Sequence, residues 1–547
     1  MHAKTLAAAT AGLLLGAAST GQVAQAAPGA TELVSVVSSG TRAAGDSNLR
    51  HGGGTLSADG RYVVFHSYRA GIVAGDDNGV ADVFLRDLHL GVTQLVSGAV
   101  DGGVGNAYAA DASVSVDGRY VAFFSPASDL VQGDRNGAGD IFVWHRESGR
   151  IELASIGSSG RQGNDTSLES AISADGRYVA FTSFASNLAR RDSNGNSDVF
   201  LRDRQGGYTE RVSVASDGRQ ANGYSWQPCV SADGRYVAFY STATNLVPGD
   251  RGGFADVFVR DRQTRQTLRA SVAGDGAAAN GYSVQPTLSG NGRYVAFVST
   301  ATNLVPGDTN RRIDVFVKDL ETGQVERVSV SSTGAQGNGA SYEPALSADG
   351  RYVIFESFAS NLVPGDTNAS HDVFVHDRDT RQTRRVSLGT GGTQSDGASW
   401  TPSLSADGRF VAFRSDATNL AAVDGNRSSD VYVRDLGPND AGEVAFTIKP
   451  SALDFGTRRV GSSTTLEFWL RNRSGTYLPI DRMVVRGADR AAFEVAHTCG
   501  TLVAPGDVCR LSVTFRPATA GTMTAELKVH VADGLVRTRE LVAVATF

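Results

Sequence analysis

A pattern of three polar residues recurs along the chain with the spacing of the first ligands in a calcium-binding loop. It reads Asp-x-Asn-x-x-x-Asp, and two copies begin within the octapeptide NLVPGDTN at 303–310 and 361–368. The residues of these two copies are Asp308, Asn310, Asp314, Asp366, Asn368 and Asp372. Carboxylate and amide oxygens at alternate positions are typical of calcium loops. Calcium is therefore the one cofactor that the sequence indicates.

The same residues also have a structural interpretation. Asp and Asn side chains accept hydrogen bonds from nearby backbone N–H groups in Asx turns, and every copy has the same loop to fold. One copy has Gly252 in place of Asn, which removes a ligand but not a turn, and the twelfth-position Glu of an EF-hand is absent. The turn is the favoured interpretation, and calcium binding is the alternative.

Aromatic residues form a second candidate site. They are Tyr108, Tyr224, Trp226, Tyr282, Tyr342 and Trp400, each a few positions before a recurrent Ser. Flat amphipathic rings give a large contact area at low entropic cost, which suits sugars and peptides. The alternative is that these rings pack between neighbouring repeats.

Signatures of known enzymes are missing from the sequence. There is no G-x-S-x-G elbow and no H-E-x-x-H motif. The His residues do not recur in register with the repeat described next. We therefore nominate no catalytic residue, and the sequence favours a non-catalytic protein.

An internal repeat of 58 residues organises most of the chain. The segment Ser-Ala-Asp-Gly-Arg, or a close variant, begins at Ser57, Ser115, Ser173, Ser231, Ser289, Ser347 and Ser405. Each copy contains four short β-rich runs punctuated by Asp-Gly or Asn-Gly turns, which predicts a four-stranded meander. A second recurrent polar residue precedes each first strand, at Asn48, Asn106, Asn164, Asn222, Asn280, Asn338 and Asp396, where we expect turn chemistry.

The seven copies predict a seven-bladed β-propeller. The runs around "RYVAF" and "DVFV" are apolar at consecutive positions, which is typical of strands covered on both faces. The seventh copy lacks its fourth strand, whereas the segment TELVSVV at 31–37 resembles the fourth strand TERVSVA at 209–215. We expect this N-terminal strand to complete the last blade and close the ring, which removes exposed sheet edges. The long loops between strands two and three and between four and one then share one face, the expected binding surface.

The repeat resembles the PD40 (WD40-like, TolB-type) propeller family through the pattern "SADGRYVAF…DVFVRD" over residues 31–437. From 441 to 547 the repeat is absent, and alternating strands predict an Ig-like β-sandwich. The segment APGDVCRLSVTFRP at 504–517 is similar to ASH/HYDIN-like (choice-of-anchor D) Ig-like domains, and that resemblance implies an accessory or adhesive module.

The N-terminus has the features of a secretory signal peptide over residues 1–26, with a short apolar core and an A-x-A site at Ala24–Ala26. We expect a secreted protein, or a periplasmic one if the host has an outer membrane. Cys499 and Cys509 flank a short loop, and in an exported protein they are expected to form a disulfide. Cys229 takes a position that is otherwise held by small residues.

Charge and hydropathy limit the partners. The net charge of −6 gives no basic excess for nucleic acid, and no later segment is a transmembrane candidate. We predict an exported, monomeric, non-catalytic protein that presents the loop face of its propeller to an extracellular protein or glycan. The alternative is a secreted propeller lyase or hydrolase acting on polysaccharide. A cluster of non-recurring His, Glu or Arg residues converging on the central channel would favour that enzyme, whereas a channel lined only by repeated residues would favour the binding protein.

Overall fold

The computed structural model describes residues 29–36, 46–50, 54–250, 253–421, 428–437, 446–449, 452–472, 478–500, 502–504, 507–531 and 536–547. Within these residues there is no α-helix, and the only helical element is the 3₁₀ helix η1 (Arg490–Ala492). The predicted all-β class is confirmed. The predicted signal peptide lies outside the described residues. No helix in the described ranges is long and apolar enough to cross a membrane.

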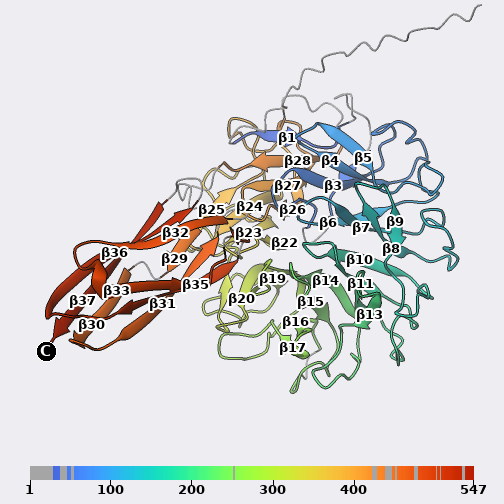
Figure 1. Ribbon diagram of the computed structural model, residues 1–547. Coiled ribbons are helices and arrows are strands. Elements are labelled where there is room, and N and C mark those ends of the chain that lie inside the picture. The colour runs from blue at the N-terminus through green and yellow to red at the C-terminus, as the bar shows by residue number, and fades with distance from the viewer. Residues whose placement is uncertain are drawn as a thin grey trace, which may run out of the picture.

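The repeats form four-stranded antiparallel sheets arranged as the blades of a propeller (Figure 1), and the described residues contain seven such sheets. The blades are numbered 1 to 7 by their recurrent Ser, from Ser57 to Ser405. Blade 1 contains β2 (Ser47–Asn48), β3 (Tyr62–Ser67), β4 (Asp82–Asp87) and β5 (Val92–Leu95). Blade 2 contains β6 (Ala110–Val114), β7 (Tyr120–Ser125), β8 (Asp140–His145) and β9 (Ile151–Leu153). Blade 3 contains β10 (Ser167–Ile172), β11 (Tyr178–Ser183), β12 (Asp198–Asp203) and β13 (Tyr208–Arg211). Those of blades 4 and 5 are β14 (Ser225–Val230), β15 (Tyr236–Ser241), β16 (Asp256–Asp261) and β17 (Gln266–Arg269); β18 (Ser283–Leu288), β19 (Tyr294–Ser299), β20 (Asp314–Asp319) and β21 (Val325–Arg327). Those of blades 6 and 7 are β22 (Ser341–Leu346), β23 (Tyr352–Ser357), β24 (Asp372–Asp377) and β25 (Gln382–Arg385); β26 (Ser399–Leu404), β27 (Phe410–Ser415), β28 (Asp430–Asp435) and β1 (Thr31–Leu33).

The N-terminal strand closes the ring, as the sequence predicts. β1 pairs with β28 in antiparallel register, with Thr31 opposite Arg434 and Leu33 opposite Tyr432. The Arg434 guanidinium donates a 2.8 Å hydrogen bond to the Thr31 hydroxyl, which donates in turn to the Leu388 carbonyl at 2.6 Å. The first and last repeats are therefore joined in one sheet.

The recurrent Ser-Ala-Asp-Gly-Arg segment folds as a tight turn between the first two strands. In blade 4 the Ser231 hydroxyl donates to Asp233 at 2.7 Å, and the backbone N–H of Arg235 donates to the same carboxylate at 2.9 Å. Gly234 has φ +72°, and a Cβ there would lie 2.1 Å from the ring of Tyr178 in the preceding blade. Only glycine fits this position, because both the backbone conformation and the packing of the neighbouring aromatic ring require it.

The strands of each blade are held together by apolar packing and by one repeated ion pair. In blade 4, the rings of Phe239 on β15 and Phe258 on β16 stack at 6.0 Å and are fully buried. Arg235 donates two hydrogen bonds to Asp261 at the end of β16, at 3.0 and 2.7 Å. This bidentate geometry joins the start of the second strand to the end of the third.

The C-terminal region is a sandwich of two sheets with its own apolar core. One sheet contains β29 (Phe446–Lys449), β31 (Thr464–Asn472), β35 (Val508–Phe515) and β33 (Phe493–His497). The other contains β30 (Ala452–Arg459), β37 (Val536–Thr546), β36 (Gly521–Val531), β32 (Leu478–Arg486) and β34 (Leu502–Val503). The predicted disulfide between Cys499 and Cys509 is present.

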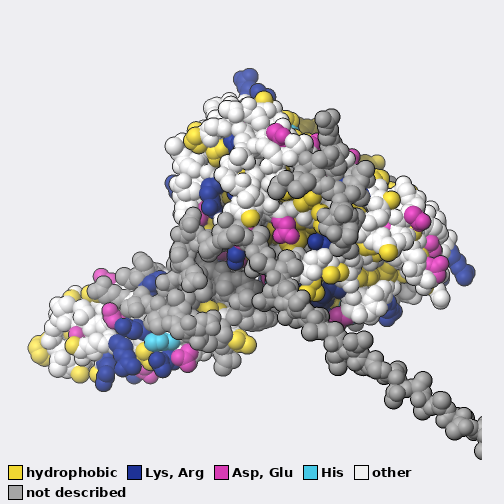
Figure 2. All heavy atoms as spheres, turned by 90° about the horizontal axis from the view of Figure 1, so that it is seen from above, with side chains coloured by type: hydrophobic (Ala, Val, Ile, Leu, Met, Phe, Trp, Pro, Cys, Tyr) yellow, Lys and Arg dark blue, Asp and Glu magenta, His cyan; other side chains and the backbone are white. Residues whose placement is uncertain are grey.

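The Ig-like domain extends away from the propeller (Figures 1 and 2), and a hydrogen bond joins it to the tight-turn face. Arg471 on β31 donates a 2.9 Å hydrogen bond to the carbonyl of Asp349, in the Ser-Ala-Asp-Gly turn of blade 6. Burial, and then the nearby carboxylate of Asp233 in the same turn of blade 4, raise the pKa of Asp507. In a meander the long loops emerge on the side opposite the tight turns, so the loop face is left open by this contact.

Candidate functional site: the loop face and the central channel

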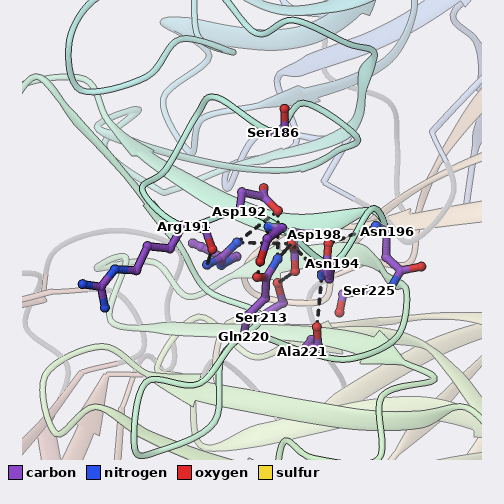
Figure 3. Close-up of polar contacts among 12 residues, drawn as sticks. Ser186, Arg191, Asp192, Asn194, Asn196, Asp198, Ser213, Gln220, Ala221 and Ser225 are labelled. Carbon is purple, nitrogen blue, oxygen red and sulfur yellow. Dashed lines mark hydrogen bonds and ion pairs between the residues drawn. The ribbon is translucent and has the colours of Figure 1, made fainter.

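The Asp-x-Asn-x-x-x-Asp loops form Asx turns in the structure. In blade 3 (Figure 3) the backbone N–H of Asn196 donates to the side-chain oxygen of Asn194 at 2.9 Å. The amide of Asn194 donates to Asp198 at 3.1 Å and to the Ala221 carbonyl at 3.0 Å. The Asn therefore ties its own loop to the following connection between strands four and one. The favoured turn interpretation describes what these side chains do here.

An arginine from the fourth strand lies between the two carboxylates in blades 3 to 6. In blade 5, Nη1 of Arg327 is 3.0 Å from Asp308 and 3.5 Å from Asp314. The other three blades have Arg211, Arg269 and Arg385 in the same position. Burial raises the pKa values of Asp308 and Asp314, and the guanidinium opposes this effect.

Blade 6 has the same arrangement at slightly longer distances. Arg385 is 3.6 Å from Asp366 and 3.8 Å from Asp372, and Asn368 donates to the Ser395 carbonyl at 3.1 Å. Calcium at these two loops stays a prediction, and the ion would have to displace a guanidinium. In the part of the chain that the structure describes, no group of three or more His, Cys, Asp or Glu side chains is placed to hold a metal ion.

The predicted aromatic residues lie on the loop face, and their exposure divides them into two groups. Tyr108, Tyr224 and Tyr282 are 43, 47 and 53% exposed. Trp226, Tyr342 and Trp400 are half-buried. The second group packs between blades, because Trp226 meets Phe184 edge to face at 5.4 Å and Trp400 lies 6.1 Å from His371. The half-buried rings are thus mainly used for packing, whereas the three tyrosines keep about half of their surface exposed.

The loop face also carries exposed aromatic residues that the sequence analysis missed. They are Tyr68, Phe184, Phe254 and Phe358. Phe254 packs edge to face on Tyr282 at 5.0 Å, so two blades share one aromatic pair. Three of them could have been found from the sequence, because Tyr68, Phe184 and Phe358 are separated by multiples of the repeat length and so occupy equivalent positions.

A ring of polar side chains lines the central channel, and the sequence analysis did not identify it. Six of the innermost strands are bulged, and the residues with positive φ at this level are Asp111, Glu169, Gln227, Gln285, Glu343 and Thr401. Their φ values lie between 45 and 57°. The Glu169 carboxylate accepts the backbone N–H of Gln227 at 2.8 Å, and the Gln285 amide donates to Glu343. Burial raises the pKa of Glu169.

Blade 1 interrupts this ring with an insertion that places Arg50 in the channel. In blade 1, Ser47 and Leu56 both pair with the second strand and are nine positions apart in the sequence. The equivalent residues of blade 3, Ser167 and Ile172, are only five positions apart. Blade 1 therefore has four additional residues between these two pairings. The prediction that Asn48 belongs to the recurrent Asn series is therefore wrong, since it lies within β2 opposite His66. The 58-residue spacing of the Ser landmarks hides this insertion, because it precedes Ser57.

Arg50 is buried among the acidic residues of the polar ring. Its guanidinium donates to the Pro228 carbonyl at 3.4 Å. Burial lowers its pKa, and Asp111 and Glu169 oppose the shift. A cavity of about 70 Å³ remains, lined by Arg50 with the carboxylates and amides of the ring. This volume holds a few water molecules.

Next to the polar ring, towards the tight-turn end, the channel contains a second cavity that Arg50 also lines. This cavity of about 180 Å³ is lined by the aliphatic residue that precedes each recurrent Ser, and by Cys229. Cys229 is a free thiol whose pKa is raised by burial to about 12, so it is protonated and unreactive. At the tight-turn end, backbone hydrogen bonds of 2.9–3.2 Å join the residue after each Ser to its neighbour, at Ala58→Val116, Val116→Ala174, Ala174→Ala232, Ala232→Gly290, Ala348→Ala406 and Ala406→Ala58.

Comparison with known proteins identifies the C-terminal domain. Residues 445–542 match the family model described as the HYDIN/CFA65/VesB-like, Ig-like domain. No curated protein matches the chain. Among solved structures, a putative TolB from Agrobacterium tumefaciens is similar over 52% of this chain and 89% of its own, at 17% identity and a TM-score of 0.30. The family match and the repeated four-stranded sheets confirm the predicted architecture, a β-propeller followed by an Ig-like domain of the HYDIN/CFA65/VesB-like kind.

Proposed function

We propose that this protein is an exported, non-catalytic interaction protein whose propeller loop face binds an extracellular protein or glycan. A propeller combined with an Ig-like domain suggests a role in protein interaction, and the disulfide is consistent with a periplasmic or extracellular location. The observation that carries the proposal is the set of exposed aromatic side chains on the loop face, headed by Tyr108, Tyr224 and Tyr282. Exposed aromatic groups of this kind mark binding surfaces more often than isolated aliphatic residues do.

The placement of the Ig-like domain supports this assignment. Its contact through Arg471 uses the tight-turn face, so the domain and the aromatic residues do not compete for one surface. The protein would then bind its ligand on one side while the Ig-like domain serves as the accessory module on the other.

The test is binding of the purified mature protein to whole cells and to a panel of soluble polysaccharides. A triple variant, Tyr108→Ser, Tyr224→Ser and Tyr282→Ser, is expected to lose binding at least tenfold and to keep its melting temperature. The matched control is Tyr208→Ser, because Tyr208 is 39% exposed but lies on the outer strand β13. Loss of binding after protease treatment of the cells assigns a protein ligand, and competition by a polysaccharide assigns a glycan. Unchanged binding by the triple variant would refute the proposal.

One observation favours the second candidate, a secreted enzyme acting on polysaccharide. Arg50, Asp111, Glu169 and Glu343 do not form a complete recurring set, and they converge on the channel. This is the arrangement that the sequence analysis associated with an enzyme. The cavity beside them is too small for a sugar unit, so Arg50 would have to move before any substrate entered. Release of reducing ends from a polysaccharide, abolished by Glu169→Gln, would establish this candidate.

A further inference from the structure

Among the residues that the structure describes, no arginine or glutamine lies between the two carboxylates of blade 1, unlike the pairs of blades 2 to 6. In blades 3 to 6 the position between the two Asp residues holds an arginine, as described above. In blade 2 it holds the amide of Gln162, which donates to Asp134 at 2.6 Å and to Asp140 at 2.8 Å. The equivalent loops of blades 2 to 6 thus serve as internal controls for the loop of blade 1.

Blade 1 replaces both of these partners with apolar residues. Leu95 stands at the arginine position and Val104 at the position of Gln162. The two carboxylates, Asp76 and Asp82, are nevertheless kept, and they are 5 and 0% exposed. Oδ2 of Asp76 is buried and has no hydrogen-bond partner among the described residues. An orphaned carboxylate oxygen of this kind is costly unless something outside the chain satisfies it.

The remaining contacts of the loop fix the orientation of Asp82. The Ser97 hydroxyl donates to Oδ1 of Asp82 at 2.6 Å, and the amide of Asn78 donates to Oδ2 at 2.8 Å. Burial, and then the negative charge of Asp82, raise the pKa of Asp76 to about 6.

We propose that blade 1 binds one hard divalent cation between Asp76 and Asp82, in the position that a guanidinium occupies in blades 3 to 6. Two carboxylates supply the charge, and water molecules complete the coordination shell, as hard cations with few protein ligands require. Asn78 is a positioning residue, because its amide holds Asp82 and its oxygen accepts the backbone N–H of Val80 at 3.1 Å. The inference is independent of the loop-face ligand.

The test uses calcium as the probe, with variants copied from other blades of the same chain. The mature protein is treated with a chelator at pH 7.5, and its thermal unfolding and calorimetric binding are followed as calcium chloride is added. We expect one site per molecule and a saturable rise in melting temperature. At a free calcium concentration 100 times the dissociation constant, the unfolding equilibrium shifts about 100-fold towards the folded state.

Leu95→Arg and Val104→Gln introduce the partners found in blades 3 to 6 and in blade 2. Both variants are expected to be more stable than the wild type in chelator and to lose the calcium response. Asp76→Asn should also lose the response, whereas Asp308→Asn should keep it. A wild type that gives neither heat nor a shift with calcium, magnesium or manganese would overturn the proposal and leave the pair sharing a proton. A response lost in Asp308→Asn but kept in Leu95→Arg would overturn it in favour of a site in blade 5.

Discussion

The guanidinium of Arg327 lies 3.0 Å from the carboxylate of Asp308, in a loop whose sequence resembles a calcium site. The chain therefore contains its own counter-ion for this acidic loop. Several consequences of this and related ion pairs can be measured.

Replacing Arg327 with Leu, the residue found at the same position in blades 1 and 2, should destabilise the propeller. The side chains of Asp308 and Asp314 are 2 and 0% exposed, so the variant leaves buried charge without a partner. We expect the free energy of unfolding to fall by about 3 kcal/mol, measured by urea denaturation. Adding Asp308→Asn and Asp314→Asn should recover part of the loss. If the loop binds calcium, Arg327→Leu will also be stabilised by added calcium. A urea midpoint of Arg327→Leu equal to that of the wild type would contradict the predicted loss of stability.

Acid should weaken the Arg–Asp pairs that join the second and third strands. Hydrogen bonds, of which the one from Arg235 has the largest effect, lower the pKa of Asp261 to about 2, below its ordinary value of 3.8. A carboxyl whose pKa is lowered in the folded state stabilises the protein above pH 3.8 and loses that contribution as the pH falls towards 2. The wild type should exceed Asp261→Asn by about 1 kcal/mol at pH 5, because Arg235 is partly exposed to solvent. The difference should shrink at pH 3 and vanish near pH 2, and a constant difference would refute the assignment.

The buried ion pair between Arg69 and Asp430 should contribute strongly to ring closure. The two side chains are 0 and 1% exposed and lie 2.9 Å apart, and Arg69 also donates to the Ser35 carbonyl at 2.6 Å. Arg69→Met should lower the free energy of unfolding by about 3–5 kcal/mol. The matched control is Arg414→Met in blade 7, whose pair with Asp416 is 3.9 Å apart and partly exposed, so a loss of about 1 kcal/mol or less is expected. Equal losses in the two variants would contradict a special role for Arg69.

Reduction of the disulfide should affect only the Ig-like domain. The Cys499–Cys509 link closes a loop with a sequence separation of 10 residues, for which the chain-entropy model gives about 2.5–3 kcal/mol. Differential scanning calorimetry with a reductant should lower the transition of the Ig-like domain and leave that of the propeller in place. Cys229→Ser should show the same response to reductant as the wild type. A shift of the propeller transition would show that the two domains unfold together.

The sequence predicted the fold in detail because the repeat shows each strand seven times. The closing role of β1 followed from a missing strand at one end and a spare one at the other, and its pairing with β28 confirms it. The insertion before Leu56 was not predicted, because the recurrent landmarks lie after it. The contact between Arg471 and Asp349 was not predicted either, since no sequence pattern records which surfaces of two domains meet.

The candidate site was predicted less completely, for a physical reason. The acidic loop could be recognised from its spacing, but the arginine that neutralises it comes from another strand, about 13 residues further along the chain in blade 5. A comparison of the fourth strands would have identified this arginine. Four of them have Arg211, Arg269, Arg327 and Arg385 at the position where the other three have Leu33, Leu95 and Leu153. The channel residues were overlooked because a bulge breaks the alternation that normally assigns side chains to a face.

Closure by the N-terminal strand has a consequence for how the protein is made. Thr31 leaves the ribosome 403 residues before its partner Arg434, so the first strand must wait unpaired for nearly the whole of synthesis. Until then the growing array has two open sheet edges, which are exposed to pairing with other chains. A chain that stops anywhere short of β28 can never close. Closure of the ring therefore requires that translation be complete. Truncated products keep unpaired strand edges, by which proteases and chaperones can recognise them.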